Sequence, residues 1–306
     1  MWCGRGRGRS FNKQQAIEEV AHLNRLSHAH IVRVVGTYVM GNQLSILLYP
    51  VADCNLEHFL EDMRTTETTE TIKSVMFSSS KDFFGCLINA TKYIHSNLVK
   101  HMDIKPQNVL VRRNTGHELH IYTVLVADFG IARSYDKPEA TETDGSTSYT
   151  LMYAAPEVID QEMRGLAADI FSLGCVFMEL FITLCDTTSC IAEQKNAVLL
   201  QREAIFSQPQ WTHLQSLLGC AKASPCSGVS YSMSIETLQK AYRAQINTLQ
   251  LLPTSGSWLS TICDMISRNP KERPTAVQLE GVFGKLACCD RGPYALETYQ
   301  EGPTTI

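Results

Sequence analysis

The stretch HMDIKPQN, residues 101–108, places a carboxylate, an amine and an amide within six residues, as Asp103, Lys105 and Asn108. Pro106 does not suit a regular helix, so we expect these side chains on a loop that enters a strand. A carboxylate can orient a hydroxyl group and accept its proton, an ammonium can neutralise phosphate, and an amide oxygen can coordinate Mg²⁺. Each residue alone is more often a loop or cap residue, but together they form a candidate catalytic loop.

Further motifs follow this loop in order. Asp128-Phe129-Gly130 comes twenty residues after Asn108, at the end of an expected strand, and Ala155-Pro156-Glu157 comes later. The order and spacing resemble the protein kinase family, in which H-R-D-x-x-x-x-N, D-F-G and A-P-E recur. The resemblance covers about residues 11 to 286 and therefore nearly the whole chain.

Two later residues extend the resemblance. Asp169 in DIFSLG is similar to the aspartate that anchors the long central helix of the family, and Arg273 in RNPKERPTA is similar to its late arginine. We therefore expect a salt bridge between Arg273 and Glu157. We also expect a packed column formed by Leu23, Val34, His101 and Phe129.

The resemblance implies catalytic roles by position. Asp103 is similar to the aspartate that orients the substrate hydroxyl and accepts its proton. Lys105 resembles the lysine of Ser/Thr-directed kinases, and Asn108 and Asp128 resemble the Mg²⁺ ligands that bridge the ATP phosphates. The implied activity is transfer of the ATP γ-phosphate to Ser or Thr hydroxyls of a protein substrate.

The resemblance also implies an adenine pocket. Leu48 lies at the position that guards it, backbone groups of Tyr49 and Val51 would bind the adenine edge, and Leu110 would pack under the base. Glu19 falls on the apolar stripe of the first expected helix and corresponds to the glutamate that pairs with a strand lysine. The alternative for Glu19 is a solvated position at the rim of that stripe.

The hydrophobic pattern predicts two hairpins followed by helices. Expected helices cover residues 11–28, 55–63, 82–97 and most of the chain from 156. Expected strands cover 31–39, 44–51, 109–112 and 120–127, and expected loops cover 65–80, 186–189 and 224–232. This is an α+β protein. With the resemblance, it implies a bilobal kinase-like fold with a truncated small β lobe and a mainly helical large lobe. The domains expected are a basic tail (1–10), a small-lobe remnant (11–51), a large lobe (52–286) and a C-terminal tail (287–306).

The N-terminal stretch GRGRGRS, residues 4–10, does not have the spacing or the preceding strand of a phosphate-binding loop. Three strands with their loops need roughly 25 residues, but only about ten precede the first helix. Lys13 lies in the same helix as Glu19 and cannot face it from a strand. We therefore expect this chain to lack the glycine-rich loop and the phosphate-binding lysine, and to bind Mg·ATP weakly.

Two interpretations stay open. The first is a Ser/Thr kinase whose N-terminal part is missing from this chain, and the second is an inactive kinase-like module that binds other proteins. Met102 stands where many kinases have an arginine that binds a phosphate on the activation segment. Its presence suggests activation without that phosphorylation.

The composition, 44% hydrophobic and 19% charged, is that of a soluble globular protein. A net charge of −4 gives no argument for nucleic acid or an anionic membrane as partner. The longest apolar run, residues 170–185, is too short to span a bilayer and contains Glu179, so we expect a buried helix.

Eleven cysteines are scattered along the chain without a C-x-x-C motif. Neither Cys185/Cys190 nor Cys288/Cys289 has zinc-ligand spacing with a nearby histidine. This pattern indicates reduced cysteines in a cytoplasmic or nuclear protein.

Overall fold

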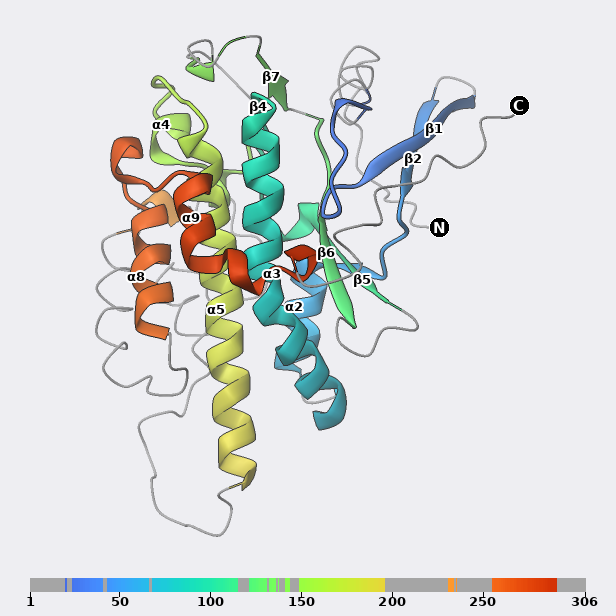
Figure 1. Cartoon of the computed structure of the whole chain (residues 1–306), viewed down its shortest axis with the longest axis vertical. Coiled ribbons are helices and arrows are strands. Elements are labelled where there is room, and N and C mark those ends of the chain that lie inside the picture. Colours follow the sequence, from blue (N-terminus) through green and yellow to red (C-terminus); the bar gives the residue numbers. More distant parts are fainter. Residues whose placement is uncertain are drawn as a thin grey trace.

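The structure is a computed structural model of the whole chain. It describes residues 20, 24–40, 43–65, 68–114, 121–130, 132–135, 137, 141–143, 149–195, 231–233, 235 and 255–290. Strands and helices alternate in the first half of these residues and helices dominate the second half, so the fold is α+β, as expected. A β-hairpin stands at one side of a larger helical body (Figure 1).

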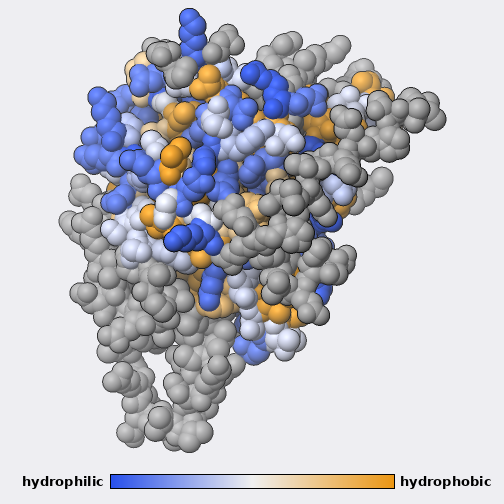
Figure 2. Space-filling view, in the orientation of Figure 1, coloured by the Kyte–Doolittle hydropathy of each residue, from blue (hydrophilic) through white to orange (hydrophobic). Residues whose placement is uncertain are grey.

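The hairpin consists of β1 (Arg33–Met40) and β2 (Gln43–Tyr49), which pair antiparallel. It is the hairpin predicted around Gly41-Asn42. Several of its apolar side chains face solvent; Val39 is 70% and Met40 is 66% exposed. Apolar surface accordingly shows over this part of the molecule (Figure 2).

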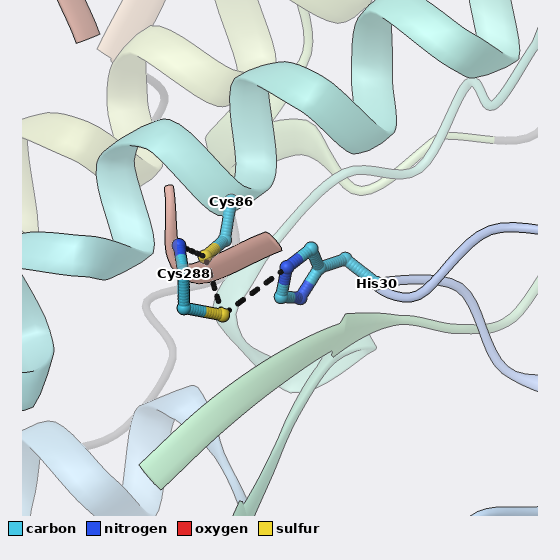
Figure 3. Close-up of side chains that lie close together, drawn as sticks. All are labelled: His30, Cys86 and Cys288. Atoms are coloured by element: carbon cyan, nitrogen blue, oxygen red, sulfur yellow. Dashed lines mark hydrogen bonds between the residues drawn. The ribbon is translucent and has the colours of Figure 1, made fainter. Parts of the chain in front are cut away.

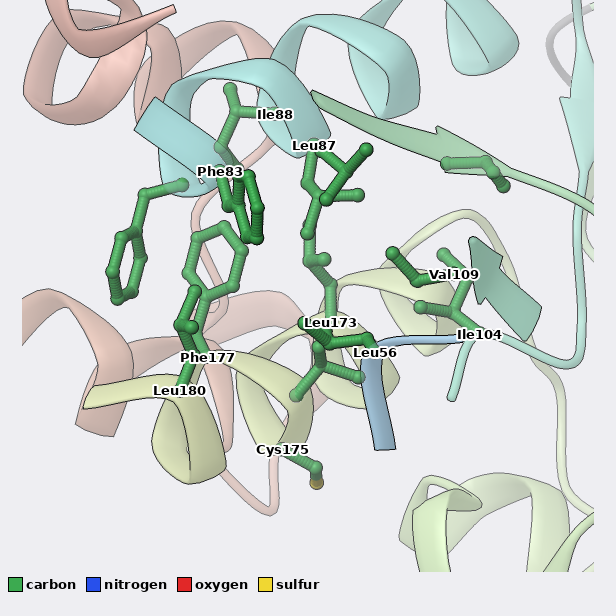
Figure 4. Packing of buried hydrophobic residues seen from close by; sticks show 14 of the residues in the cluster. Leu56, Phe83, Leu87, Ile88, Ile104, Val109, Leu173, Cys175, Phe177 and Leu180 are labelled. Atoms are coloured by element: carbon green, nitrogen blue, oxygen red, sulfur yellow. The ribbon is translucent and has the colours of Figure 1, made fainter. Parts of the chain in front are cut away.

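The helical body is built around α3 (Glu70–Ser96) and α5 (Ala167–Lys195). Figure 4 shows Phe83 and Leu87 of α3 pointing toward Phe177 and Leu173 of α5. All four side chains are buried. The window Ala167–Leu184 of α5 has the length and apolar composition of a membrane span, but 94% of it is buried within the folded chain. This helix therefore serves as the central core helix, as expected for a buried apolar run.

Short sheets join the hairpin to the helical body. The strands β3 (Cys54–Asn55), β5 (Val109–Arg113) and β6 (Tyr122–Val126) form an antiparallel sheet in the order β3-β5-β6. Val32 N donates to Val126 O at 3.0 Å, and Val126 N donates to His30 O at 2.8 Å. The segment before β1 is thus tied to the strand that leads to Asp128.

The remaining elements position the loops around these sheets and helices. In chain order they are α2 (Leu56–Arg64), β4 (Val99–Lys100), η1 (Pro106–Asn108), β7 (Arg133–Ser134), η3 (Leu151–Tyr153), α4 (Pro156–Ile159), η4 (Tyr231–Met233), α8 (Ser255–Met265), η5 (Pro270–Glu272), α9 (Ala276–Phe283), η6 (Gly284–Leu286) and η7 (Cys288–Asp290).

Two expected loops are helical, so these predictions were wrong. Much of the Thr/Ser-rich stretch 65–80 belongs to α3, which begins at Glu70, and the stretch 186–189 belongs to α5, which continues to Lys195. Ser80 shows the reason in α3: its hydroxyl donates to Met76 O at 2.7 Å within the helix, so a polar side chain can be fully buried there. Burial against the core thus outweighs the low helix propensity of Ser and Thr.

Several predictions fall on residues outside the described part. They concern the tail 1–10, Glu19 and most of the first helix, residues 224–230 and the C-terminal stretch from 291. The domain boundaries stay predictions.

Candidate active site

The structure brings together the catalytic loop residues that the sequence singled out. Asp103 lies just before η1. Lys105 Nζ donates to Asp103 Oδ2 at 2.5 Å, and Asn108 Nδ2 donates to Asp103 O at 2.8 Å and to Oδ2 at 3.0 Å. The Asp103 carboxylate is therefore held in place by a cation and an amide. With its amide nitrogen donating to Asp103, Asn108 has its amide oxygen as the atom for a cation.

Thr150 is a site residue that sequence reasoning did not assign to catalysis. Its hydroxyl donates to Asp103 Oδ1 at 2.7 Å and accepts from Lys105 Nζ at 2.7 Å. Asp103, Lys105 and Thr150 thus form a closed triangle of hydrogen bonds. The signal available in the sequence was the hydroxyl-rich segment shortly before Ala155-Pro156-Glu157, in which no single residue stands out.

The backbone of the catalytic loop is held by Asp169 of α5. Asp169 Oδ2 accepts from His101 N at 2.9 Å, and Oδ1 accepts from Met102 N at 2.8 Å. Met102 has φ of 69°, a left-handed conformation that costs free energy for a non-glycine residue. The two hydrogen bonds hold Met102 in that conformation, which places Asp103 where its side chain meets Lys105.

Asp169 is ionised despite its complete burial. Burial raises the pKa of this carboxyl, but the hydrogen bond with His95 Nε2 at 3.1 Å and the backbone N–H of His101 outweigh that effect. The pKa lies below its ordinary value. A charged acceptor is the stronger partner for two backbone N–H groups.

The segment Asp128-Phe129-Gly130 is anchored by Phe129. The Phe129 ring is fully buried and lies 4.6 Å from the ring of His101, centroid to centroid. His101 Nε2 is 3.0 Å from Ala127 O, and Asp103 N donates to His101 Nδ1 at 3.3 Å. His101 thus connects the catalytic loop to the segment that carries Asp128. Of the expected column, this contact is confirmed, and Val34 packs partly buried against the core, while Leu23 lies outside the described residues.

Asp128 has an exposed side chain and φ of 63°. Its Oδ1 accepts from Gly130 N at 3.3 Å. An exposed carboxylate and the amide oxygen of Asn108 are hard oxygen donors, the kind that Mg²⁺ prefers. The donor set therefore fits the expected metal.

The residues expected at the adenine pocket lie around β2 and β5. Tyr49 and Val51 are exposed, by 42% and 75%, while Leu48 and Leu110 are partly buried against the core. The Arg33 guanidinium lies 4.8 Å from the centre of the Tyr49 ring. Glu19, the other residue expected on this side, lies outside the described residues.

The predicted pair of Glu157 and Arg273 is confirmed. Arg273 NH1 donates to Glu157 Oε1 at 2.6 Å, and NH2 donates to Oε2 at 2.7 Å. Both side chains are buried, so this bidentate pair fastens the segment after Thr150 to the loop before α9.

A small hollow, with room for about one water molecule, lies beside Asp103 and Thr150. Its lining also includes Tyr149, Ala154 and Ala155 from the segment that precedes α4.

Comparison with known proteins agrees with this arrangement. The family model described as "Protein kinase domain" matches residues 5–281. Over 171 residues, or 54% of this chain, the sequence is 32% identical to cyclin-dependent kinase E-1 of Arabidopsis thaliana, and the match covers 34% of that protein. A match of the same length and identity to cyclin-dependent kinase 4 of Mus musculus covers 51% of that protein. It is 28% identical to the serine/threonine-protein kinase nekl-2 of Caenorhabditis elegans over 56% of this chain and 46% of that protein. The chain thus spans about a third to a half of the length of these relatives.

Proposed function

This chain belongs to the protein kinase family, and we propose that it transfers the γ-phosphate of ATP to serine or threonine hydroxyls of protein substrates. The observation that carries the proposal is the triangle of Asp103, Lys105 and Thr150. Its carboxylate is placed to receive a proton, and its ammonium stands beside that carboxylate to neutralise a phosphoryl group.

Each residue of the triangle has one task. A substrate hydroxyl hydrogen-bonds to the Asp103 carboxylate, which orients its oxygen toward the phosphorus and accepts the proton. Lys105 Nζ offsets negative charge on the transferred group. The Thr150 hydroxyl bridges the two residues and keeps the carboxylate turned toward the substrate. Positioning and charge neutralisation are the main contributions that a protein makes to phosphoryl transfer.

The nucleotide is proposed to bind on the side of β2 and β5. Leu110 packs under the adenine base, and backbone groups of Tyr49 and Val51 bind its edge. Asn108 and Asp128 hold Mg²⁺, which supplies charge neutralisation across the phosphates. Glu19 stays the proposed partner for a phosphate-binding lysine.

We also propose that residues 1–306 alone bind Mg·ATP weakly and transfer phosphate slowly. The sequence of GRGRGRS and the helix expected after it provide no glycine-rich loop and no lysine on an opposing strand. A triphosphate held only by Asn108, Asp128 and Lys105 is open to water, which weakens each electrostatic contact compared with a closed site.

The test is phosphate transfer from radiolabelled Mg·ATP to a mixture of Ser/Thr- and Tyr-containing peptides. Asp103→Asn should lower the rate at least about 100-fold. Thr150→Ala should also lower it, and Thr150→Ser should restore it because serine keeps the hydroxyl bridge. Asp62→Asn is the matched control, since Asp62 is an exposed carboxylate on α2.

Equal incorporation in the wild-type chain and in Asp103→Asn would overturn the proposal and favour the alternative, a kinase-like module that binds proteins. Phosphotyrosine as the main product would overturn the assignment of Ser/Thr specificity. The weak-binding proposal is tested separately, by the nucleotide concentration that shifts the melting temperature. A clear upward shift at sub-millimolar Mg·ATP would contradict it.

A further inference from the structure

A buried group of sulfur and imidazole ligands lies where three segments of the chain meet, and none of its members belongs to the catalytic loop. His30 precedes β1, Cys86 lies in α3 and Cys288 lies in η7. Figure 3 shows the three side chains converging. His30 Nε2, Cys86 Sγ and Cys288 Sγ all lie within 4.8 Å of one another, with 3.4 Å between the two sulfurs and 3.5 Å between Cys288 Sγ and His30 Nε2.

The His30 ring is oriented by its other nitrogen. Nδ1 lies 2.8 Å from the Val124 carbonyl oxygen, which can only accept, so Nδ1 carries a hydrogen. In the neutral ring Nε2 then presents a lone pair to Cys288. This is the arrangement found around histidines that bind metals, where a carbonyl fixes the ring and its tautomer.

Close backbone packing brings the two cysteines together. A Cβ atom on Gly85 would lie 2.4 Å from Ala287 N and 2.6 Å from Phe283 O, so only glycine allows α3 to approach this segment so closely. The neighbours of Gly85 and Ala287 are Cys86 and Cys288. Cys288 N donates to Cys86 Sγ at 3.4 Å. The position of both sulfurs is therefore set by the backbone.

We propose that His30, Cys86 and Cys288 bind Zn²⁺, with Cys289 as the fourth ligand. Tetrahedral zinc with Zn–S of about 2.3 Å and Zn–N of about 2.0 Å requires about 3.8 Å between sulfurs and about 3.5 Å between sulfur and nitrogen. The observed 3.4 Å and 3.5 Å differ from these by a few tenths of an ångström at most. Cys289 adjoins Cys288, is partly buried and accepts from Asn89 Nδ2 at 3.3 Å.

This proposal departs from the sequence-based expectation that the cysteines form no zinc site. That prediction required a histidine close to the cysteines along the chain. Here Cys86 and Cys288 are 202 positions apart, and His30 and Cys288 are 258 apart. A site assembled from such distant segments has no spacing signature.

The metal would fasten the small β part to the helical body. His30 lies just before β1, and it would be joined through the metal to α3 and to the segment after α9. A metal that binds only the folded chain stabilises the fold. Zinc would stabilise the attachment of the hairpin most, because the hairpin has few other contacts.

The test begins with the full chain purified under reducing conditions. We expect one equivalent of zinc by elemental analysis. Removal by a chelator should lower the melting temperature, and zinc at a hundred times its dissociation constant should raise it again by about 5 °C. Cobalt(II) in place of zinc should give the charge-transfer and d–d absorption of a tetrahedral thiolate site.

Cys86→Ala, Cys288→Ala and His30→Gln should each abolish the stoichiometric binding and the cobalt spectrum. Cys175→Ala is the matched control, because Cys175 is a buried thiol of α5 in an apolar setting. If the ligand variants do not fold, the wild-type measurements decide. A wild-type chain without zinc, with no change in melting temperature and no cobalt spectrum, would overturn the proposal, as would a Cys86–Cys288 disulfide under the same reducing conditions.

Discussion

Replacing Arg273 should destabilise the fold strongly, because its guanidinium donates hydrogen bonds to buried acceptors that would lose their donor. Besides the two bonds to Glu157, Nε donates to Ser267 O at 2.7 Å, NH1 donates to Ala167 O at 3.0 Å and NH2 donates to Arg268 O at 3.2 Å. The Arg273 side chain is 0% and the Glu157 side chain 3% exposed. Water therefore cannot replace the lost donors without opening the structure.

The expected cost follows from burial. Removing one member of a buried ion pair costs about 3 to 5 kcal/mol, since the other charge is left uncompensated. Arg273→Met and Glu157→Gln should each fall in this range. Arg273→Lys keeps the charge but loses the planar fork and most of the carbonyl contacts, so we expect about 2 to 3 kcal/mol. The double variant Glu157→Gln/Arg273→Met leaves neither charge alone and should cost less than the sum of its parts by at least about 2 kcal/mol.

Urea unfolding followed by intrinsic fluorescence measures these differences. The control is Asp160→Asn, because Asp160 and Arg268 form an exposed pair at 4.0 Å. Such a pair contributes no more than about 0.5 kcal/mol. Single-site costs below about 1 kcal/mol, or additive costs in the double variant, would refute the reasoning that this buried pair fastens the two segments.

Two further predictions concern the packing around the helical body. Burial lowers the pKa of Lys100 from 10.5 to about 8, so the buried charge destabilises the fold below pH 8, and this destabilisation disappears as the pH rises toward 10.5. The stability of Lys100→Met relative to wild type should therefore fall by about 2 kcal/mol between pH 7 and pH 10. A stability difference that does not change with pH would contradict this explanation. Gly174→Ala should lower the free energy of unfolding, measured by thermal unfolding, by about 1 to 3 kcal/mol, because the new Cβ would lie 2.8 Å from the Ile266 side chain. The control is Gly281→Ala, which should be neutral or stabilising because its Cβ would meet nothing within 4 Å.

The sequence predicts best those features that depend on residues close together along the chain. The catalytic loop follows from a carboxylate, an amine and an amide around Pro106, and the β1–β2 hairpin follows from two β-rich runs around a short turn. The pair of Glu157 and Arg273 is distant in sequence, yet a family resemblance over many spaced positions predicts it. The buried contact of His101 and Phe129 was predictable in the same way.

What the sequence does not predict depends on burial and on long-range packing. The first turns of α3 contain Thr and Ser, whose local preferences favour a loop, and only the packing of residues such as Met76 and Ser80 makes the helix favourable. Thr150 is one hydroxyl among several in a polar segment, and its role depends on where the segment folds back over Asp103. The group around His30 requires three distant segments to meet.

The catalytic loop is held more firmly than the residues proposed for adenine binding. Asp103 is fixed by contacts within the chain: Asp169 holds the backbone of the two residues before it, and Thr150 holds its side chain. Groups that are already in place do not have to be reorganised when the transition state forms, so they favour the chemical step once substrates are bound. The residues proposed for adenine binding, Tyr49 and Val51, are instead mostly exposed. Weak binding of nucleotide with an intact chemical step raises KM for ATP more than it lowers kcat. The proposed low activity of this chain should therefore lie mainly in its affinity for Mg·ATP.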